Sequence, residues 1–280
     1  MGCRVTRTET TDDKYALRSV SRALDVLQAL AASGGDGMSV GEIAEAVGVS
    51  RSTAFTLLQT LVARGYVSDV RFGGARRYQL GLTLIHLGDR AQAEMAIARI
   101  AMPTLQQLTE ATGLTSRLAV FDDGCAVAVA RVDAPGPFRL VASLGRRELP
   151  HSSAVGKSLL LNLSEDEVLS LLHRLGMPRR TEKTITTPQD LVRNLKEVRN
   201  LGYAFDDEED MIGVACVGAG IYGPSKSVVA AMSVTGIKHG RGLKELHELG
   251  MIVRTHADQV SLLLGGPTHT TYRSLTNERE

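Results

Sequence analysis

Apolar residues near the start of the chain recur every three or four positions and stop at a pair of glycines, Gly34-Gly35. Because one face of an α-helix repeats at this spacing, the pattern predicts a helix over 19–33 with its apolar residues facing inward. The residues with this spacing are Val20, Leu24, Leu27 and Leu30.

Two further helices are predicted directly after it. Ser39 and Glu42 match the capping box, in which each side chain bonds the other residue's backbone N–H, so a second helix begins there and ends at Gly48. Ser50 predicts the cap of a third helix over 50–65. Its inward face consists of Ala54, Leu57, Leu58 and Leu61.

The outward face of the third helix carries polar side chains that suit the major groove of DNA. Arginine can reach guanine or phosphate, and hydroxyl groups can reach phosphates or base edges. Two short helices joined by a turn with glycine are typical of a helix-turn-helix. The predicted DNA-binding residues of this helix are Arg51, Ser52, Thr53 and Thr56.

Two β-type segments around Gly73-Gly74 predict a hairpin after the third helix, with Arg71, Arg76 and Arg77 near its tip. Such a hairpin is typical of the wing of a winged helix-turn-helix, and its arginines are expected to bind DNA. The alternative is a small helical core with a solvated basic edge. Aromatic content of 4% with no tryptophan argues against single-strand stacking and favours duplex DNA.

The remaining pattern divides the chain further. Apolar spacing over 82–102 predicts a linker helix, and Pro103 is expected to begin the next helix because proline is tolerated in a first turn. Beyond it, the pattern predicts a hairpin at Asp123-Gly124 and a strand at 138–145. It then predicts helices at 151–163, 164–176 and 188–202, strands at 202–209, 214–221 and 227–236, and a last helix near 242–264.

Composition limits the classes of function. The chain has 280 residues and a net charge of +1, so any contact with nucleic acid must come from a local basic patch. No apolar segment reaches the length of roughly 18 residues that a membrane span needs, and no secretion signal precedes the first helix, so we expect a cytoplasmic protein. The cysteines form no CxxC pair, which argues against a structural zinc site.

The tripeptide Gly156-Lys157-Ser158 matches the end of a phosphate-binding loop. That loop also needs another glycine, separated from the Gly-Lys pair by four residues. This chain has His151 at that position, and its side chain would crowd the phosphates. Nucleotide binding is therefore disfavoured, and no cofactor is expected.

The order of these segments resembles that of the IclR family of bacterial transcription regulators over about residues 17–265. The resemblance rests on the N-terminal helices and hairpin, the linker helix and three later motifs, "HSSAVGKSLL", "GYAFDDEEDMIGVACVGAGI" and "VVAAMSVTG". It implies an α+β protein with an N-terminal winged helix-turn-helix and a C-terminal α/β effector-binding domain whose antiparallel sheet is flanked by helices. Dimers or tetramers on operator DNA are also implied. The expected boundaries are a disordered tail 1–17, DNA-binding domain 18–81, linker helix 82–102, effector-binding domain 103–265 and disordered tail 266–280.

The resemblance also implies which residues bind a small-molecule effector. A helix start offers unpaired N–H groups and a positive dipole end, so a small organic acid is the expected ligand. For each position the alternative is an ordinary role in the core: Ser233 and Thr235 alternate along a strand, and Cys216 is of a type often buried. The residues implied are Ala154, Val155, Gly156, Asp206, Cys216, Ser233 and Thr235.

The acidic run Asp206-Asp207-Glu208-Glu209-Asp210 suggests a metal site or a pair of catalytic carboxylates. Consecutive acids are more typical of a solvated loop, and no nearby His/Cys spacing completes a metal site. The alternative function is an enzyme acting on a small acid with His151, Ser152 and this loop. No nucleophile, base and orienting group are recognisable together, so we predict a regulator and no catalytic residues.

Overall fold

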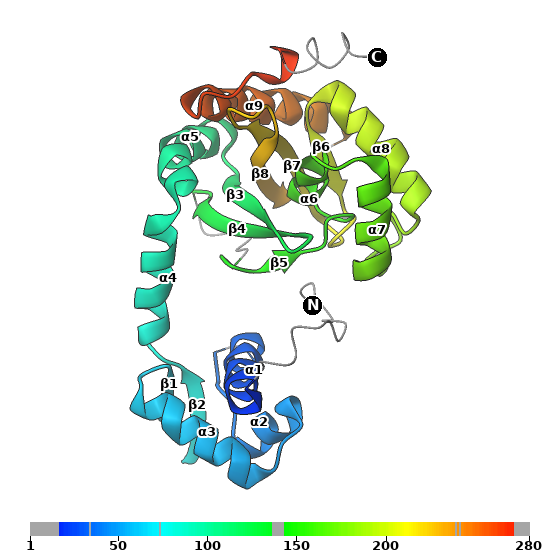
Figure 1. Ribbon diagram of the computed structural model, residues 1–280. Coiled ribbons are helices and arrows are strands. Elements are labelled where there is room, and N and C mark those ends of the chain that lie inside the picture. The colour runs from blue at the N-terminus through cyan, green and yellow to red at the C-terminus, as the bar shows by residue number, and fades with distance from the viewer. Residues whose placement is uncertain are drawn as a thin grey trace. The chain divides into compact units, whose positions relative to one another are not determined.

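The computed structural model describes residues 17–271 except 34, 73, 136–142, 239 and 241. The described chain forms two compact units that meet in sequence at Glu94 and Met95 (Figure 1). Of the expected tails 1–17 and 266–280, residues 1–16 and 272–280 lie outside the described residues, as does most of the strand expected at 138–145.

The N-terminal unit contains three helices, a hairpin and a fourth helix. Its elements are α1 (Arg18–Ala32), α2 (Val40–Val47), α3 (Arg51–Ala63), β1 (Val67–Phe72), β2 (Ala75–Leu80) and α4 (Thr83–Glu94). The predicted capping box is confirmed, because Ser39 N donates to Glu42 Oε2 at 2.7 Å and Glu42 N donates to Ser39 Oγ at 3.3 Å. Ser50 caps α3, as expected. The hairpin is confirmed too, and it pairs Arg71 with Arg76.

The inward face of α1 differs from the prediction. Val26 is fully buried and Leu30 nearly so, whereas Val20 and Leu24 are 52% and 55% exposed. The helix carries apolar residues on more than one face, and α2 and α3 cover the face that contains Val26 and Leu30. Periodicity alone does not reveal which of two apolar faces meets the neighbouring helices.

The expected single linker helix over 82–102 is wrong. The helix α4 ends at Glu94, Met95 is extended, and α5 (Ala96–Thr112) continues through Pro103. Proline has no N–H to donate, so it removes one intrahelical bond, but buried residues on both sides of it, Ala101 and Leu105, fix α5 against the sheet. Tertiary packing therefore overrides the local preference of proline for a first turn.

The C-terminal unit is built on a six-stranded antiparallel sheet of order β5-β4-β3-β8-β7-β6. Its strands are β3 (Thr115–Asp122), β4 (Cys125–Val132), β5 (Arg147–Glu148), β6 (Ala204–Asp207), β7 (Val214–Tyr222) and β8 (Val228–Ile237). The predicted hairpin at Asp123-Gly124 joins β3 to β4, and both of its residues have positive φ.

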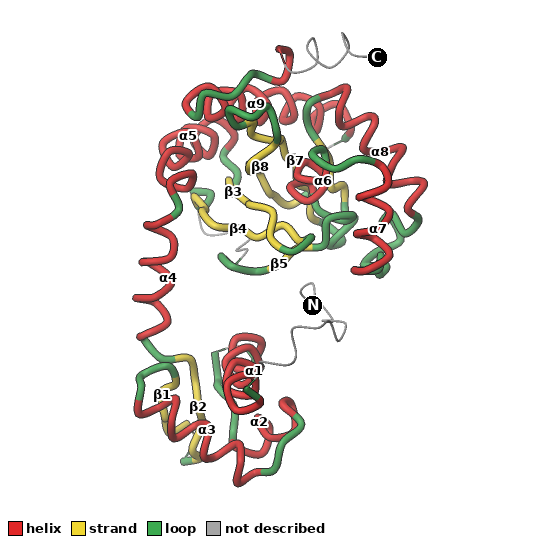
Figure 2. Tube along the Cα trace, in the orientation of Figure 1, coloured by secondary structure: helices red, strands yellow, loops and turns green. Residues whose placement is uncertain are grey.

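Helices cover both faces of this sheet (Figure 2). Helices α5 and α9 (Leu243–Leu263) pack on one face around a core that includes Leu105, Leu118 and Val253. Helix α6 (Ala154–Leu160) packs on the other face, and α7 (Glu165–Leu175) and α8 (Pro188–Leu201) share a further core with it. The face toward α6 is the α6 face below.

Residues 266–271, which were expected to belong to a disordered tail, are part of the folded unit. His269 is buried, its backbone N–H donates to Asp258 Oδ1 at 2.8 Å, and its ring Nε2 lies 3.0 Å from Arg199 O. The ring packs where Gly202 has no side chain. The residues after Gly266 are mostly polar, which is typical of an unstructured chain end, so the sequence did not indicate this contact between distant segments.

Candidate nucleic-acid interface and ligand site

The exposed face of α3 presents the residues that the sequence predicted. Arg51, Ser52 and Thr56 are exposed, and Thr53 is partly buried. Ser50 Oγ lies 2.9 Å from Ser52 Oγ and 2.8 Å from Thr53 Oγ1, so the hydroxyls at the start of the helix form one connected group. Helix α3 therefore offers a cation and hydroxyl groups on one open face.

The three arginines of the hairpin have different surroundings. Arg71 is exposed. Arg77 Nη1 donates to Gly37 O and to Glu42 Oε2, each at 3.0 Å, so it links β2 to the start of α2. Arg77 thus stabilises the unit through its own contacts, which the sequence did not indicate.

Arg76 is positioned by an acid and two aromatic rings. Its Nε donates to Asp69 Oδ2 at 2.7 Å, and its guanidinium lies 5.8 Å from the ring centre of Phe55 and 5.4 Å from that of Tyr78. Phe55 is 43% exposed on α3 and was missed by the sequence reasoning, which followed polar residues alone. These contacts order the hairpin against α3.

In the C-terminal unit, four predicted ligand residues come together on the α6 face. Cys216 pairs in register with Asp206 on one side and with Thr235 on the other. Ser233 pairs with Gly218, whose missing Cβ would lie 2.9 Å from the backbone of Ala154. Residues in register share a face, so this row lies toward the start of α6.

The other three predicted residues begin α6 and are buried in packing. A Cβ on Gly156 would lie 2.6 Å from Pro150 Cα and from Ser153 Oγ, so glycine is required for chain packing at this position. The N–H of Gly156 already donates to Ser153 Oγ at 3.2 Å. Val155 packs in the apolar core of the α6 face and Ala154 is 1% exposed. Ligand contact at these positions stays a prediction.

Burial controls the protonation of the polar row. Asp206 Oδ1 accepts from the N–H groups of Glu209 and Asp210, yet burial raises the pKa of Asp206 to about 7. Burial also raises the pKa of the Cys216 thiol, whose Sγ lies 3.2 Å from Thr235 Oγ1. The thiol is therefore neutral near pH 7 and suits a polar contact better than nucleophilic attack.

Lys157, the lysine of the apparent phosphate loop, is fully buried and occupied inside the protein. Its Nζ donates to Glu209 Oε1 at 2.6 Å, Glu209 Oε2 at 2.7 Å and Phe205 O at 2.8 Å. The ammonium has three N–H donors, and these contacts use them. Lys157 links α6 to the end of β6 and has no donor left for a phosphate.

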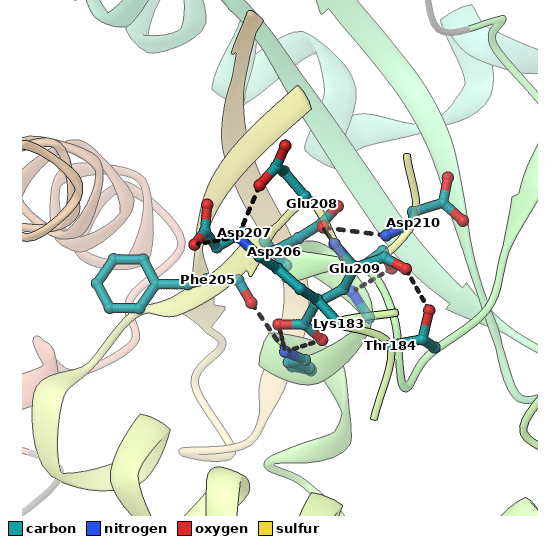
Figure 3. Close-up of polar contacts among 12 residues, drawn as sticks. Lys183, Thr184, Phe205, Asp206, Asp207, Glu208, Glu209 and Asp210 are labelled. Carbon is teal, nitrogen blue, oxygen red and sulfur yellow. Dashed lines mark hydrogen bonds and ion pairs between the residues drawn. The ribbon is translucent and has the colours of Figure 1, made fainter. Parts of the chain in front are cut away.

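The acidic run folds into a turn whose side chains point in different directions (Figure 3). Asp206 and Glu209 point inward, whereas Glu208 bonds Lys183 and Lys238 at 2.6 and 3.0 Å. These contacts lower the pKa of Glu208 to about 2. Asp210 accepts from Arg180 Nε at 3.1 Å. Within the described part of the chain, no three His, Cys, Asp or Glu residues are grouped to hold a metal ion.

The residues of the alternative enzyme reading are not assembled as a catalytic set. His151 is buried, its Nε2 lies 3.3 Å from Pro178 O, and burial lowers its pKa. Ser152 Oγ is buried and finds no hydrogen-bond partner among the described residues. The imidazole thus faces a backbone carbonyl, and no hydrogen bond from it to Ser152 is observed.

Comparisons with known proteins match both parts of the chain to one family. The model of the IclR helix-turn-helix domain matches residues 19–71, and that of the bacterial transcriptional regulator IclR C-terminal domain matches residues 90–262. The acetate operon repressor of Salmonella typhimurium is 33% identical over 252 residues, which cover 89% of this chain and 91% of that protein. The chain belongs to the IclR family.

Solved structures of IclR-family regulators share the fold. The IclR regulator from Alicyclobacillus acidocaldarius is 28% identical with a TM-score of 0.77, and the match covers 90% of this chain and all of that one. An IclR homolog from Microbacterium hydrocarbonoxydans complexed with 4-hydroxybenzoate is 20% identical with a TM-score of 0.73, covering 88% and 98% of the two chains. At this identity, the second match shows the fold alone.

The prediction of an α+β IclR-family transcriptional regulator that binds DNA is therefore confirmed. None of the described helices is long and apolar enough to cross a membrane.

The sequence pattern did not indicate one basic residue on the α6 face. Arg117 on β3 is 5% exposed, pairs in register with Ser233, and donates from Nη1 to Glu148 Oε1 at 2.5 Å. Arg117 Nε and Ser233 Oγ are both buried without a hydrogen-bond partner in the described residues. A buried polar atom without a partner costs about 1–3 kcal/mol, so these two donors require an explanation.

Proposed function

We propose that this IclR-family regulator binds a small organic acid on the α6 face and that the ligand changes its affinity for operator DNA. The buried polar row Asp206, Cys216, Thr235 and Ser233 carries this proposal. Apolar side chains would serve a plain core at less cost, because each buried polar atom must be paired. Of the four, Ser233 Oγ has no hydrogen-bond partner among the described residues, and a ligand with oxygen atoms would supply one.

In the N-terminal unit, we propose that Arg51, Ser52, Thr53 and Thr56 enter the major groove. Arg71 then lies along the backbone of the duplex, and Arg76 contacts DNA while Asp69 and Phe55 hold it. The exposed face of α3 and the contacts of the hairpin support this proposal. The acidic partner of Arg76 restricts its motion, so the remaining N–H donors of the guanidinium are presented in fixed directions.

Two copies of the chain would read an operator with two similar half-sites, as symmetric dimers or tetramers do. Repression is the proposed outcome because the curated relative at 33% identity is a repressor. The protein would act in the cytoplasm, where bacterial DNA is found, and as a regulator without catalytic residues.

The experiment combines ligand binding with operator binding. Melting of the full chain is followed with small acids, and a ligand that binds the folded state raises the midpoint. Each acid that raises it is then added to an operator titration. We expect a change in DNA affinity of roughly 5- to 150-fold, the range of typical coupling energies. An acid that binds without changing operator affinity would contradict this function.

A further inference from the structure

We infer that Arg117 recognises the negative charge of the ligand on the α6 face, and that the ligand is a carboxylate that accepts hydrogen bonds from Arg117 Nε and Ser233 Oγ. This inference rests on the proposed function, since it names the ligand class of the same site. It differs from the sequence expectation, which placed the acid at the start of α6.

The geometry that carries it is a pair of donors on neighbouring strands. Arg117 on β3 and Ser233 on β8 are directly opposite in the sheet register. Ser233 is fully buried and Arg117 is 5% exposed, and the orphan atoms are the guanidinium Nε and the hydroxyl Oγ. Both lie in the row that faces α6, because Ser233 is also opposite Gly218.

The chemistry of these two groups selects an anion with two oxygen atoms. Guanidinium is charged at every relevant pH and is a donor only, and the serine hydroxyl can rotate to donate. A carboxylate offers one oxygen atom to each donor. A carboxamide of the same shape can also bond both groups, its oxygen accepting from Arg117 Nε and its NH₂ donating to Ser233 Oγ, but it brings no negative charge to the guanidinium. The site should therefore discriminate between an acid and its amide.

Glu148 sets how much of the charge of Arg117 is available. It accepts from Arg117 Nη1 at 2.5 Å, and its side chain is 13% exposed. The next arginine in register, Arg131, pairs with Asp133 at 2.6 Å, so its charge is also balanced locally. Replacing Glu148 with glutamine keeps an acceptor for Nη1 and removes the competing negative charge. The carboxylate would then face the full charge of Arg117.

The test is calorimetric titration of the full chain with matched pairs of probes: benzoate and benzamide, 4-hydroxybenzoate and 4-hydroxybenzamide, pyruvate and pyruvamide. For at least one pair, we expect wild-type protein to bind the acid about 10-fold or more tightly than the amide. The variant Glu148→Gln should raise affinity for that acid by about 10-fold and leave affinity for the amide within about 2-fold.

A double variant avoids leaving one buried charge without its partner, which could unfold the protein. Replacing both Arg117 and Glu148 with glutamine leaves a neutral pair that can still form a hydrogen bond, and it should abolish the preference for acid over amide. The control is Arg193→Gln, at an exposed pair with Asp190 on α8, which should keep the wild-type preference. Melting temperature and operator affinity without ligand establish that each variant is folded.

The outcomes separate this inference from the proposed function. An unchanged acid preference in the double variant, or no acid of the panel binding wild-type protein at about 10 mM, overturns the role of Arg117. If a neutral probe instead binds and shifts operator affinity, the regulator function stands and the ligand class fails. If an acid binds through Arg117 without shifting operator affinity, the ligand class stands and the proposed function fails.

Discussion

The ammonium of Lys157 lies 2.6 Å from Glu209 Oε1, with the lysine fully buried and the glutamate nearly so. Removing one partner of a buried ion pair leaves an uncompensated charge, so Lys157→Met should lower the free energy of unfolding by about 3–5 kcal/mol. The double variant Lys157→Met with Glu209→Leu should recover much of that loss. Urea unfolding followed by circular dichroism measures all three proteins.

The matched control is an exposed pair in the same unit. Lys196 and Glu165 lie 3.7 Å apart with most of each side chain exposed, so Lys196→Met should change the free energy of unfolding by less than about 1 kcal/mol. Equal small effects for Lys157→Met and Lys196→Met would show that Lys157 does not link α6 to the sheet.

The free energy of unfolding should fall as the pH rises, because the folded protein favours the protonated form of Asp206. Its pKa is raised from 3.8 to about 7, so its favourable contribution is fully present below about pH 4 and is lost as the pH rises through 7. Asp206→Asn keeps the acceptor for the N–H groups of Glu209 and Asp210 and removes the ionisation. The difference in unfolding free energy between variant and wild type should grow by up to about 4 kcal/mol between pH 4 and 8. Parallel pH profiles for the two proteins would contradict the raised pKa.

Two arginines of the hairpin should behave differently when replaced. Arg71 is exposed, so Arg71→Ala should weaken binding to every DNA sequence and reduce the slope of log affinity against log salt by about 1, with stability changed by less than about 0.5 kcal/mol. Arg77 bonds Gly37 and Glu42, so Arg77→Ala should cost about 1 kcal/mol of stability. Anisotropy titrations and thermal melts of both variants give these values. A salt slope unchanged in Arg71→Ala would remove Arg71 from the interface.

The helix α4 should carry the ligand response between the two units. Ala91 is exposed on α4, and Ala91→Gly weakens a helix by about 1 kcal/mol without removing a side-chain contact larger than a methyl group. We expect the ligand to bind this variant with wild-type affinity while its effect on operator binding shrinks. Calorimetry with ligand and anisotropy with DNA separate the two quantities. An equal loss in both would contradict a role of α4 in coupling.

Local signals in the sequence predicted local structure well. The capping box at Ser39, the Ser50 cap of α3 and the hairpin between β1 and β2 each follow from a few neighbouring residues. Features that depend on distant segments were missed. The two-residue strand β5 brings Glu148 to Arg117, and neither residue carries a local pattern that indicates the pair.

The ligand site shows the same division. The resemblance to the IclR family placed Asp206, Cys216, Ser233 and Thr235, and sheet pairing brings these four together. The charge that would recognise an acid lies on Arg117, whose importance depends on burial and on unpaired atoms. Burial and hydrogen-bond satisfaction are properties of the folded chain, so the sequence pattern did not reveal them.

The central claim is sequence-specific binding of duplex DNA, and the most direct measurement is a titration of the full chain against DNA from its own upstream intergenic region. Scrambled DNA serves as competitor, and the titration is repeated at several salt concentrations. We predict tight binding that survives the competitor and weakens with log salt at a slope of about −0.9 for each phosphate neutralised. The absence of binding to any duplex at low salt would contradict the account.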